Sequence, residues 1–218
     1  PKYFKQKFER EGIQNTFYQL YPLKTIDEFN SLIGDYTELS GLNVTIPYKQ
    51  SVIPFLDELD FAAKEIGAVN TIKFERINQK LKLTGYNTDY LGFMESIKPN
   101  LKPYHNKALV LGTGGSSAAI IFALKQLAID YKLVSRNPNK ENTIGYTDLN
   151  EQVIKSHKLI INTTPLGMYP AVSEYPKIPY HHLTSEHFLY DLIYNPEITQ
   201  FLAFKKKKNA QIQNGLKM

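Results

Sequence analysis

The sequence of 218 residues predicts an α/β protein of two domains. Residues 1–88 mix short amphipathic helices with short strands, whereas buried strands alternate with helices from residue 89 onward. A strand, a glycine-rich loop, a helix and a second strand follow one another at residues 108–134, which is the pattern that opens a doubly wound parallel sheet. A chain of this length can bury two modest cores, so we expect both parts to fold.

Composition and charge exclude several classes of protein. The apolar share is 42%, and no apolar run approaches the roughly 20 residues that cross a bilayer, so we expect a soluble protein. The absence of cysteine excludes disulfides, a thiolate nucleophile and cysteine-ligated metals, and it favours a cytoplasmic location. The formal charge of +5 favours anionic ligands in general, and nucleic acid has no further support. The basic run at residues 205–208 follows apolar residues, which predicts the solvated end of an amphipathic helix.

Hydrophobic periodicity predicts the elements of the first 88 residues. In chain order they are a helix at 2–11, a strand at 16–21, a helix at 26–33, a strand at 42–46 and a hairpin with strands at 69–74 and 81–86. Pro47 suits the first turn of a helix that would follow the strand at 42–46, because that position needs no N–H donor. A strand that runs into a helix N-terminus is a favourable place for a ligand.

The second part predicts a parallel sheet with helical connections. A helix at 89–97 leads through a proline-containing linker to the strand at 108–111, the helix at 117–127 and the strand at 131–134. Further buried strands are expected at 159–161 and 188–192. We therefore expect one domain at 1–88 and a second at 89–212, with 213–218 beginning a return to the first.

Gly112, Gly114 and Gly115 lie between the strand at 108–111 and the helix at 117–127. Glycines in that place let the backbone approach a pyrophosphate, and the helix N-terminus supplies amide donors and a favourable dipole. The order Gly-Thr-Gly-Gly differs from the usual G-x-G-x-x-G, and a tight connection is the alternative. The flanking strand and helix favour a dinucleotide site.

The residues after the strand at 131–134 indicate which dinucleotide. An acidic residue at that corner binds a free ribose hydroxyl, whereas a cation binds a 2′-phosphate. This chain has Ser135, Arg136 and Asn137, and a guanidinium forms paired charge-assisted bonds to phosphate. An exposed loop arginine is the alternative, but the position predicts NADP, with Lys140 as a second cation.

Hydride transfer at a secondary alcohol needs a proton carrier beside the oxygen. The five histidines lie in linkers and polar stretches, so we expect them on the surface, with the adjacent pair as a weak indication of metal; they are His105, His157, His181, His182 and His187. A better source is the segment at 43–49, which places Asn43, Thr45 and Lys49 at the expected strand-to-helix junction. Its alternative is a capped helix with an exposed lysine.

The segment Asn-Val-Thr-Ile-Pro-Tyr-Lys at 43–49 resembles a signature of shikimate dehydrogenases, NVTxPxK. Six further segments match the family in the same order along the chain: Gly-Ala-Val-Asn-Thr at 67–71, Asn-Thr-Asp at 87–89, Gly-Thr-Gly-Gly at 112–115, Asn-Thr-Thr-Pro-Leu-Gly-Met at 162–168, Asp-Leu-Ile-Tyr-Asn-Pro at 191–196 and Asn-Gly-Leu at 214–216. Ordered matches over nearly the whole chain are highly specific, so the sequence is identified as a member of this family.

The resemblance implies a two-domain fold, with an α/β substrate-binding domain and a doubly wound Rossmann-like NADP-binding domain. It implies reversible, NADPH-dependent reduction of 3-dehydroshikimate to shikimate, on the route to chorismate and the aromatic amino acids, by a monomer or homodimer without a metal. Lys49 and Asp89 correspond to the catalytic pair. The substrate-binding residues implied are Thr45, Lys49, Asn70, Asp89 and Tyr194. The cofactor-binding residues implied are Gly112, Gly114, Gly115, Ser116, Ser135, Arg136, Thr163, Met168 and Gly215. The alternative for 162–168 is a strand end and turn, with Met168 in the core.

A carboxylate beside an ammonium favours the charged form of both groups. We therefore expect Lys49 to be protonated near neutral pH and to donate a proton during the reduction. The reverse reaction requires Lys49 to lose that proton first, so shikimate oxidation is expected to rise with pH.

Departures from the family pattern keep alternatives open. Relatives have a Ser-x-Ser pair that binds the substrate carboxylate, expected before Pro1, and a glutamine, expected after Met218, so we expect the chain to be part of a longer protein. Relatives usually read Asn-Arg-Thr where this chain reads Ser135-Arg136-Asn137, which leaves NAD open. A quinate-oxidising enzyme and a catalytically silent nucleotide-binding relative are the other candidates, although Lys49 and Asp89 together favour activity.

Overall fold

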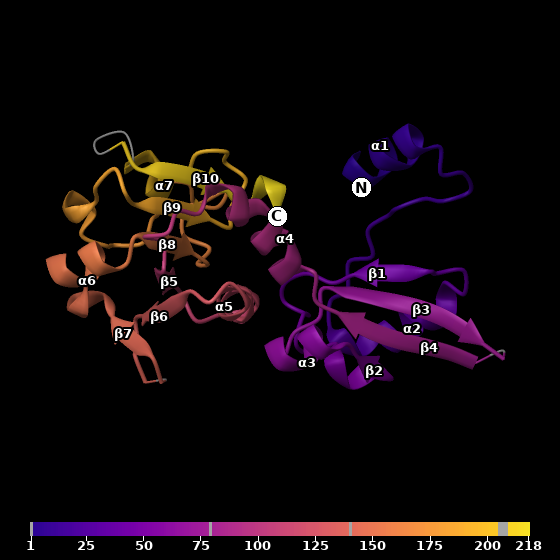
Figure 1. Cartoon of the computed structure of the whole chain (residues 1–218). Helices are drawn as coiled ribbons and strands as arrows, with labels where there is room; N and C mark the ends of the chain where they lie inside the picture. Colours follow the sequence, from indigo (N-terminus) through magenta and orange to yellow (C-terminus); the bar gives the residue numbers. More distant parts are fainter. Residues whose placement is uncertain (1, 79, 140, 205–208) are drawn as a thin grey trace. The chain divides into compact units, whose positions relative to one another are not determined.

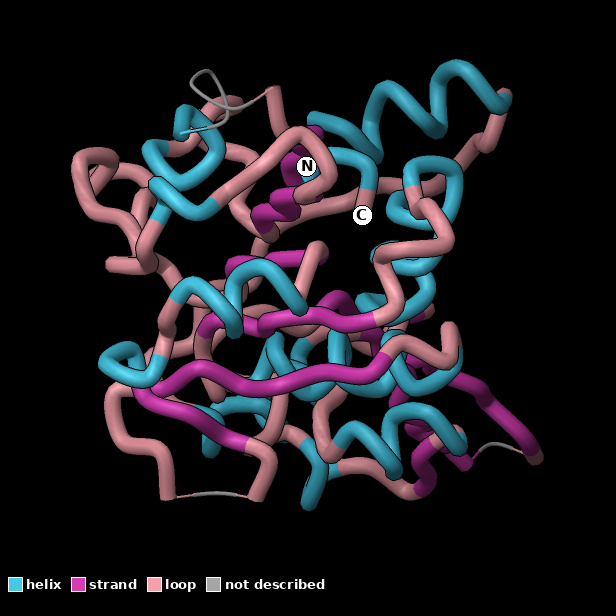
Figure 2. Tube along the Cα trace, turned by 60° about the vertical axis from the view of Figure 1, so that its left-hand side comes forward, coloured by secondary structure: helices cyan, strands magenta, loops and turns pink. Residues whose placement is uncertain are grey.

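The computed structural model describes residues 2–78, 80–139, 141–204 and 209–218. The chain forms two compact units, Pro1–Leu39 and Ser40–Met218 (Figure 1). Figure 2 shows how helices and strands alternate along the trace. Within the described part of the chain, no helix has the length and apolar character needed to cross a membrane. Lys140 and residues 205–208 lie outside the described residues, so the expectations placed on them stay predictions.

The first unit contains two of the helices that periodicity predicts. They are α1 (Lys2–Glu11) and α2 (Phe29–Asp35), the latter preceded by the 3-10 turn η1 (Ile26–Glu28). The ring of Phe4 in α1 stacks on that of Tyr18, with centroids 4.3 Å apart. The strand expected at 16–21 is wrong, because that segment has no strand partner among the described residues. Alternation of apolar residues predicts an extended chain, but a strand also needs a neighbour that shares its hydrogen bonds.

A four-stranded sheet begins the second unit. Its strands are β1 (Gly41–Asn43), β2 (Glu58–Leu59), β3 (Thr71–Ile77) and β4 (Lys80–Tyr86), in the order β1-β3-β4-β2. β3 and β4 form the expected antiparallel hairpin, with Thr71 opposite Tyr86. β1 pairs antiparallel with β3, which places Asn43 opposite Thr71. The register therefore brings the end of β1 and the start of β3 together.

The helix expected to begin at Pro47 is wrong. The Tyr48 N–H donates to the Thr45 carbonyl at 2.9 Å and closes a turn. The Lys49 carbonyl accepts from the Val69 N–H at 2.7 Å, so it is used by a distant segment and not by the next turn of a helix. Only the 3-10 turn η2 (Ile53–Phe55) follows, and the α-helix comes later, as α3 (Phe61–Ile66).

A six-stranded parallel sheet forms the rest of the second unit. Its strands are β5 (Lys107–Leu111), β6 (Asp130–Ser135), β7 (Thr143–Gly145), β8 (Leu159–Asn162), β9 (Phe188–Asp191) and β10 (Gln211–Asn214). The order β10-β9-β8-β5-β6-β7, with every pairing parallel, is that of a doubly wound sheet and confirms the fold class. The structure adds β7 and β10, which are too short or too polar for their periodicity to indicate them.

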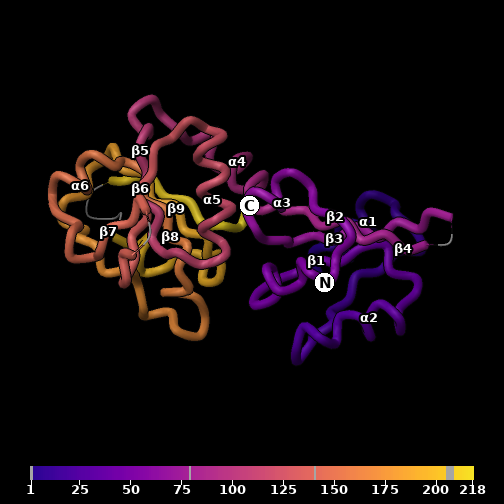
Figure 3. The backbone as a smooth tube through the Cα atoms, turned by 90° about the horizontal axis from the view of Figure 1, so that it is seen from below, coloured from indigo at the N-terminus to yellow at the C-terminus, as the bar shows by residue number. Residues whose placement is uncertain are grey.

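Helices cover both faces of this sheet. They are α4 (Asp89–Ile97), α5 (Gly115–Gln126), α6 (Glu151–Ser156) and α7 (Gln200–Ala203). Alternate residues of β5 point to opposite sides, so Val110 packs with Phe93 of α4 and Ile120 of α5, whereas Leu111 packs with Ile154 of α6. Figure 3 shows α5 and α6 on opposite sides of the strands. The continuous apolar runs of the strands follow from burial on both faces.

The expectation that all five histidines lie on the surface is wrong for His105, His157 and His187, which are buried. His187 accepts at Nδ1 from the Thr184 N–H and lies 3.0 Å from the Ile154 carbonyl through Nε2. A neutral imidazole has one donor and one acceptor nitrogen, so these two backbone groups satisfy it. Polar residues next to a histidine in sequence therefore do not keep its ring in water.

Candidate active site

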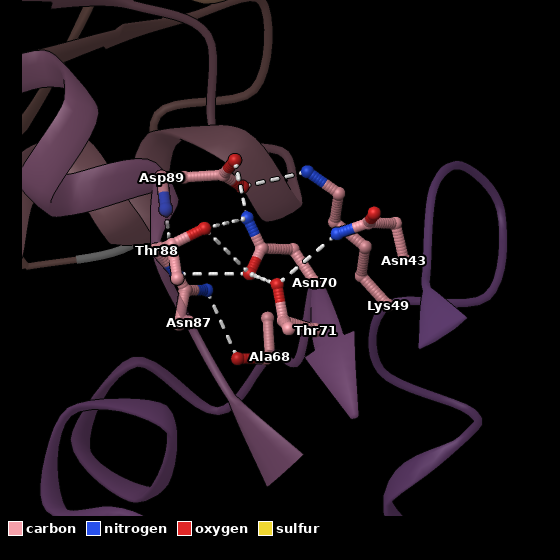
Figure 4. A network of polar contacts seen from close by, with 8 residues as sticks. All are labelled: Asn43, Lys49, Ala68, Asn70, Thr71, Asn87, Thr88 and Asp89. Atoms are coloured by element: carbon pink, nitrogen blue, oxygen red, sulfur yellow. Dashed lines mark hydrogen bonds and ion pairs between the residues drawn. The ribbon is translucent and has the colours of Figure 1, made fainter. Parts of the chain in front are cut away.

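Lys49 and Asp89 form an ion pair in the second unit (Figure 4). Lys49 lies in the turns after β1, and Asp89 is the first residue of α4. The Lys49 Nζ is 2.6 Å from the Asp89 Oδ2, and the two side chains are 19% and 20% exposed. Partly buried charges are screened less than charges on the open surface. The fold thus brings together the ammonium and carboxylate that the sequence analysis paired.

Asn70 lies just before β3 and holds the second oxygen of Asp89. Its Nδ2 donates to the Asp89 Oδ1 at 2.8 Å, and its Oδ1 accepts from the Thr88 N–H at 2.8 Å. A backbone N–H can only donate and a carboxylate can only accept, so both neighbours require the same orientation of the amide. Asn70 therefore belongs to the same polar cluster as the pair.

Asn87 fixes the start of α4 beneath that cluster. Its side chain is buried, donates to the Ala68 carbonyl at 3.0 Å and accepts from the Asp89 N–H at 3.1 Å. Within the segment 87–89, the sequence alone pointed to a role for Asp89 and not for Asn87. The match of the whole segment 87–89 to the family was the signal that could have indicated the structural role of Asn87.

Thr45 and Tyr194 are placed differently from the other substrate residues implied by the resemblance. Thr45 is exposed in the turn that carries Lys49, and Tyr194 is exposed in the loop after β9. The hydrogen-bonded network drawn in Figure 4 includes neither residue. Their contact with a substrate stays a prediction.

The glycine loop presents the N-terminus of α5. Gly114 is the residue before the helix, and no side chain caps it. A Cβ added at Gly114 or Gly115 would meet no atom within 4 Å, so each would extend into open space. Gly112 has a φ of +106°, and a Cβ there would lie 2.9 Å from the Thr163 Oγ1. Gly112 is thus needed for the backbone, whereas the space at Gly114 and Gly115 fits an anion on the helix N-terminus.

The other residues implied for the cofactor gather at the same edge of the sheet. The parallel strands β5, β6 and β8 end side by side, so Arg136 follows β6 and Thr163 follows β8 next to the glycine loop. The Thr163 hydroxyl donates to the Leu111 carbonyl at 2.7 Å. Ser116 lies in the first turn of α5, and Ser135 ends β6. This arrangement fits a dinucleotide with its pyrophosphate at α5.

Three more of the residues implied for the cofactor lie near this edge of the sheet. Burial raises the pKa of the Tyr146 hydroxyl, and the positive charge of Arg136 opposes that rise, so the guanidinium lies within electrostatic reach of Tyr146. Met168 is 45% exposed, which excludes the alternative that it is a core residue. Gly215 is buried, and a Cβ there would lie 2.1 Å from the Leu192 carbonyl oxygen, so only glycine permits this contact between the residue after β10 and the residue after β9.

A buried carboxyl group beneath this edge was not singled out from the sequence. Asp191 ends β9, and burial raises its pKa to about 6. Its Oδ1 accepts from the Asn162 Nδ2 and from the Ile193 N–H, both at 3.1 Å. The Asn162 Oδ1 in turn accepts from the Thr164 N–H at 3.0 Å. These bonds tie the loop after β8 to the loop after β9, which carry Met168 and Tyr194.

The described residues contain no group of three or more histidine, cysteine, aspartate or glutamate side chains placed to hold a metal ion. The rings of His181 and His182 lie 3.9 Å apart in the 3-10 turn η5 (Tyr180–His182). The adjacent pair therefore has no further ligand of these types within the described part of the chain.

Comparisons with known proteins agree with this geometry. The model of the shikimate dehydrogenase substrate binding domain matches residues 1–72. The chain is 38% identical over 192 residues to the shikimate dehydrogenase (NADP(+)) of Carboxydothermus hydrogenoformans, covering 82% of this chain and 67% of the relative. It is 37% identical over 212 residues to that of Clostridium botulinum strain Hall, covering 93% and 80% of the two.

Solved structures show the same likeness in three dimensions. A chorismate mutase/shikimate 5-dehydrogenase fusion protein from Clostridium acetobutylicum has a TM-score of 0.84 at 35% identity, covering 97% of this chain and 78% of that one. The shikimate dehydrogenase of Aquifex aeolicus has a TM-score of 0.82 at 32% identity, covering 98% and 80%. The ordered motifs, the doubly wound sheet and these relatives lead to one conclusion: this chain belongs to the shikimate dehydrogenase family.

Proposed function

We propose that this protein catalyses the reversible, NADP-dependent interconversion of 3-dehydroshikimate and shikimate. The observation that carries the proposal is the ion pair of Lys49 with Asp89, at 2.6 Å and held by Asn70. Relatives that carry the name shikimate dehydrogenase (NADP(+)) support the substrate and the cofactor.

Lys49 acts as the proton carrier in this proposal. When bound, NADPH supplies the hydride that reduces the ketone carbon. As charge develops on the substrate oxygen, the Lys49 ammonium donates a proton to it, and Asp89 holds that ammonium in place. In the oxidation, Lys49 takes the proton from the substrate hydroxyl as hydride leaves the carbon. Asn70, Thr45 and Tyr194 are proposed to bind the substrate hydroxyls.

The end of the parallel sheet is proposed as the cofactor site. The first amides of α5, together with Gly112, Gly114, Gly115 and Ser116, would hold the pyrophosphate. Arg136 with Ser135 would hold the 2′-phosphate, because a guanidinium can pair two N–H groups with phosphate oxygens. Thr163, Met168 and Gly215 would line the nicotinamide. NADP is therefore preferred to NAD in this proposal.

We also propose which part of the chain binds which ligand. Residues 1–88 would bind the substrate, residues 89–212 would bind NADP, and residues 213–218 would begin a return to the first domain. Within the second unit, Ala62 and Ile66 of α3 pack with Ala119 of α5, which explains why residues 40–88 do not separate from the parallel sheet as a compact unit of their own. A cytoplasmic monomer or homodimer stays a prediction from composition and resemblance.

Quinate oxidation is the second candidate. The quinate dehydrogenase of Corynebacterium glutamicum, solved in complex with NAD, has a TM-score of 0.79 at 25% identity. Shikimate and NADP remain the better proposal, because the shikimate dehydrogenase relatives are more similar in sequence and because Arg136, directly after β6, offers a cation for a 2′-phosphate.

The test is reduction of the nicotinamide cofactor by the full-length protein, with shikimate and quinate each combined with NADP and NAD. A Lys49→Ala variant is measured in parallel, together with its affinity for NADP. Turnover of shikimate with NADP that is lost in the variant, while NADP still binds, supports the proposal. Turnover mainly with quinate or NAD would favour the second candidate, quinate oxidation. No turnover despite NADP binding would contradict both candidate activities.

A further inference from the structure

We propose that Thr71 is a positioning residue for the catalytic pair. Its hydroxyl fixes the side-chain amide of Asn70, and that amide holds Asp89 in the orientation in which Asp89 binds Lys49 (Figure 4). The inference deepens the proposed function, because it concerns the same site.

Four hydrogen bonds connect the two strands to the ion pair. The Asn43 Nδ2 donates to the Thr71 Oγ1 at 3.3 Å, and the Thr71 hydroxyl donates to the Asn70 Oδ1 at 3.1 Å. The Asn70 Nδ2 donates to the Asp89 Oδ1 at 2.8 Å, and the Lys49 Nζ binds the other oxygen, Oδ2, at 2.6 Å. Every bond from Asn43 to Asp89 donates in the same direction, so each polarises the next.

The sheet places Thr71 where this chain of bonds needs it. Thr71 is the first residue of β3, and the register sets it opposite Asn43 of β1 and opposite Tyr86 of β4. Asn70 and Thr71 are adjacent in sequence, so the hydroxyl reaches the amide oxygen without any long side chain. The backbone of three strands therefore fixes the position from which Thr71 acts.

Thr88 alone does not determine the plane of the Asn70 amide. The terminal torsion of an asparagine side chain is broad, so the bonds to the Thr88 N–H and Asp89 select one of the two amide orientations but still allow the plane to rock about it. The Thr88 N–H donates to the Asn70 Oδ1 at 2.8 Å and so selects which amide atom faces it. The Thr88 hydroxyl lies 3.2 Å from the Asn70 Oδ1 and 3.0 Å from the Asn70 Nδ2, so it can donate to the first or accept from the second. Thr71 adds a second donor that faces Oδ1 from another direction, and it thereby restricts the rotation.

Loss of the Thr71 hydroxyl is expected to slow the chemical step more than it weakens substrate binding. Without the Thr71 hydroxyl, Asn70 holds Asp89 for less of the time, and the ammonium of Lys49 is aligned with the substrate oxygen less often. The loss of one neutral hydrogen bond in a positioning chain predicts a decrease in kcat of roughly 3- to 10-fold. The KM for shikimate is expected to change by less than about 2-fold, because no bond from Thr71 to the substrate is required.

The test compares Thr71→Val, which keeps the β-branched shape, with Thr71→Ser, which keeps the hydroxyl. Thr143→Val on β7 is the matched control, because its hydroxyl donates to the nearby Glu141 carbonyl at 3.2 Å and Thr143 lies outside the cluster around Asp89. For each full-length variant, kcat and the KM for shikimate are measured at saturating NADP. The side-chain amide resonances of Asn70, assigned by their loss in Asn70→Ala, are recorded by NMR without substrate.

The expected result is a lower kcat in Thr71→Val that Thr71→Ser restores, with Asn70 amide resonances that move or broaden only in Thr71→Val. An unchanged kcat with unchanged resonances overturns the inference. An increase in KM alone also overturns it, since Thr71 would then contact the substrate, and equal losses in both variants would reveal a packing role. If the wild-type protein does not oxidise shikimate, the proposed function fails, and the Asn70 resonances still decide the inference.

Discussion

The hydroxyl of Thr199 donates to the buried carboxylate of Asp191 at 2.5 Å, beneath the loops that carry Met168 and Tyr194. Burial is the largest influence on Asp191 and raises its pKa to about 6, while bonds from Thr199, Ile193 and Asn162 oppose the rise. The fold therefore keeps a charged carboxyl group inside at neutral pH, although desolvation disfavours it. The bonds that Asp191 accepts from Asn162 and Ile193 connect the loops after β8 and β9.

Asp191→Asn is expected to change the pH dependence of stability more than stability itself. The folded carboxyl group binds a proton more readily than the unfolded one, so Asp191 contributes increasing stability as pH falls from about 6 toward the ordinary value of 3.8. The asparagine variant lacks this contribution, and its free energy of unfolding at pH 7 is expected to lie within about 1 kcal/mol of wild type. Urea unfolding at pH 7, 6 and 5 measures both effects. Asp130→Asn, at an exposed position, is the control, and an identical pH dependence in wild type and Asp191→Asn would contradict the prediction.

His187→Gln is expected to make the protein less sensitive to acid. Burial lowers the pKa of His187 below its ordinary value of 6.5, so the unfolded state binds more protons than the folded state in the window just below 6.5. Stability from the neutral ring is therefore complete above pH 6.5 and is lost as pH falls through the folded-state pKa. Glutamine keeps a donor for the Ile154 carbonyl without titrating. The measurement is the difference in unfolding free energy between pH 7.5 and pH 5.5, and His181→Gln, at an exposed position, is the control. Equal differences in the two variants would contradict the prediction for His187.

Asp89→Asn is expected to lower kcat for shikimate oxidation by at least about 10-fold while NADP still binds. The amide keeps the shape of the side chain and can still accept from Lys49, but it no longer holds the ammonium by charge. Steady-state kinetics and NADP titration check this result. Asp60→Asn, at the cap of α3, provides a carboxylate outside the cluster for comparison. A kcat equal to that of wild type would exclude an electrostatic role for Asp89.

Arg136→Gln is expected to weaken NADP use by roughly 10- to 100-fold and to leave NAD use nearly unchanged, since a charge-assisted bond contributes about 1.5–3 kcal/mol. The ratio of kcat/KM for the two cofactors measures the effect. Lys125→Gln, in the last turn of α5 and so at the other end of that helix from the glycine loop, controls for loss of net charge. Equal losses with both cofactors would show that Arg136 does not contact the 2′-phosphate.

Gly114→Ala and Gly112→Ala are expected to separate cofactor binding from folding. The added methyl group at Gly114 meets no protein atom within 4 Å, so stability should hold while NADP affinity falls. At Gly112 the φ of +106° and the 2.9 Å approach to the Thr163 Oγ1 predict a loss of more than about 1 kcal/mol in unfolding free energy. Thermal unfolding and NADP titration of both variants check this. Normal NADP affinity in Gly114→Ala would contradict the proposal that the pyrophosphate binds at the N-terminus of α5.

Local patterns were sufficient for most of the fold. The hairpin β3–β4, the parallel strands β5, β6, β8 and β9, and the helices α1, α4 and α5 follow from apolar periodicity and from glycine at a strand-to-helix junction. Similarity of seven short segments to one family indicated Lys49, Asp89 and Asn70. In each case the signal is carried by residues close together in sequence.

The sequence by itself determined the α/β class and the doubly wound order of elements, and it indicated Lys49 and Asp89 as a pair, which the fold brings into contact. Only the tertiary structure decided that residues 16–21 form no strand, that the Lys49 carbonyl bonds to Val69 in place of a helical partner, and that His187 and Asp191 are buried. It also decided the orientation of the Asn70 amide between Thr88 and Asp89. The physical reason is that pairing, burial and hydrogen-bond direction depend on groups far apart in the chain, which meet only when the fold is complete.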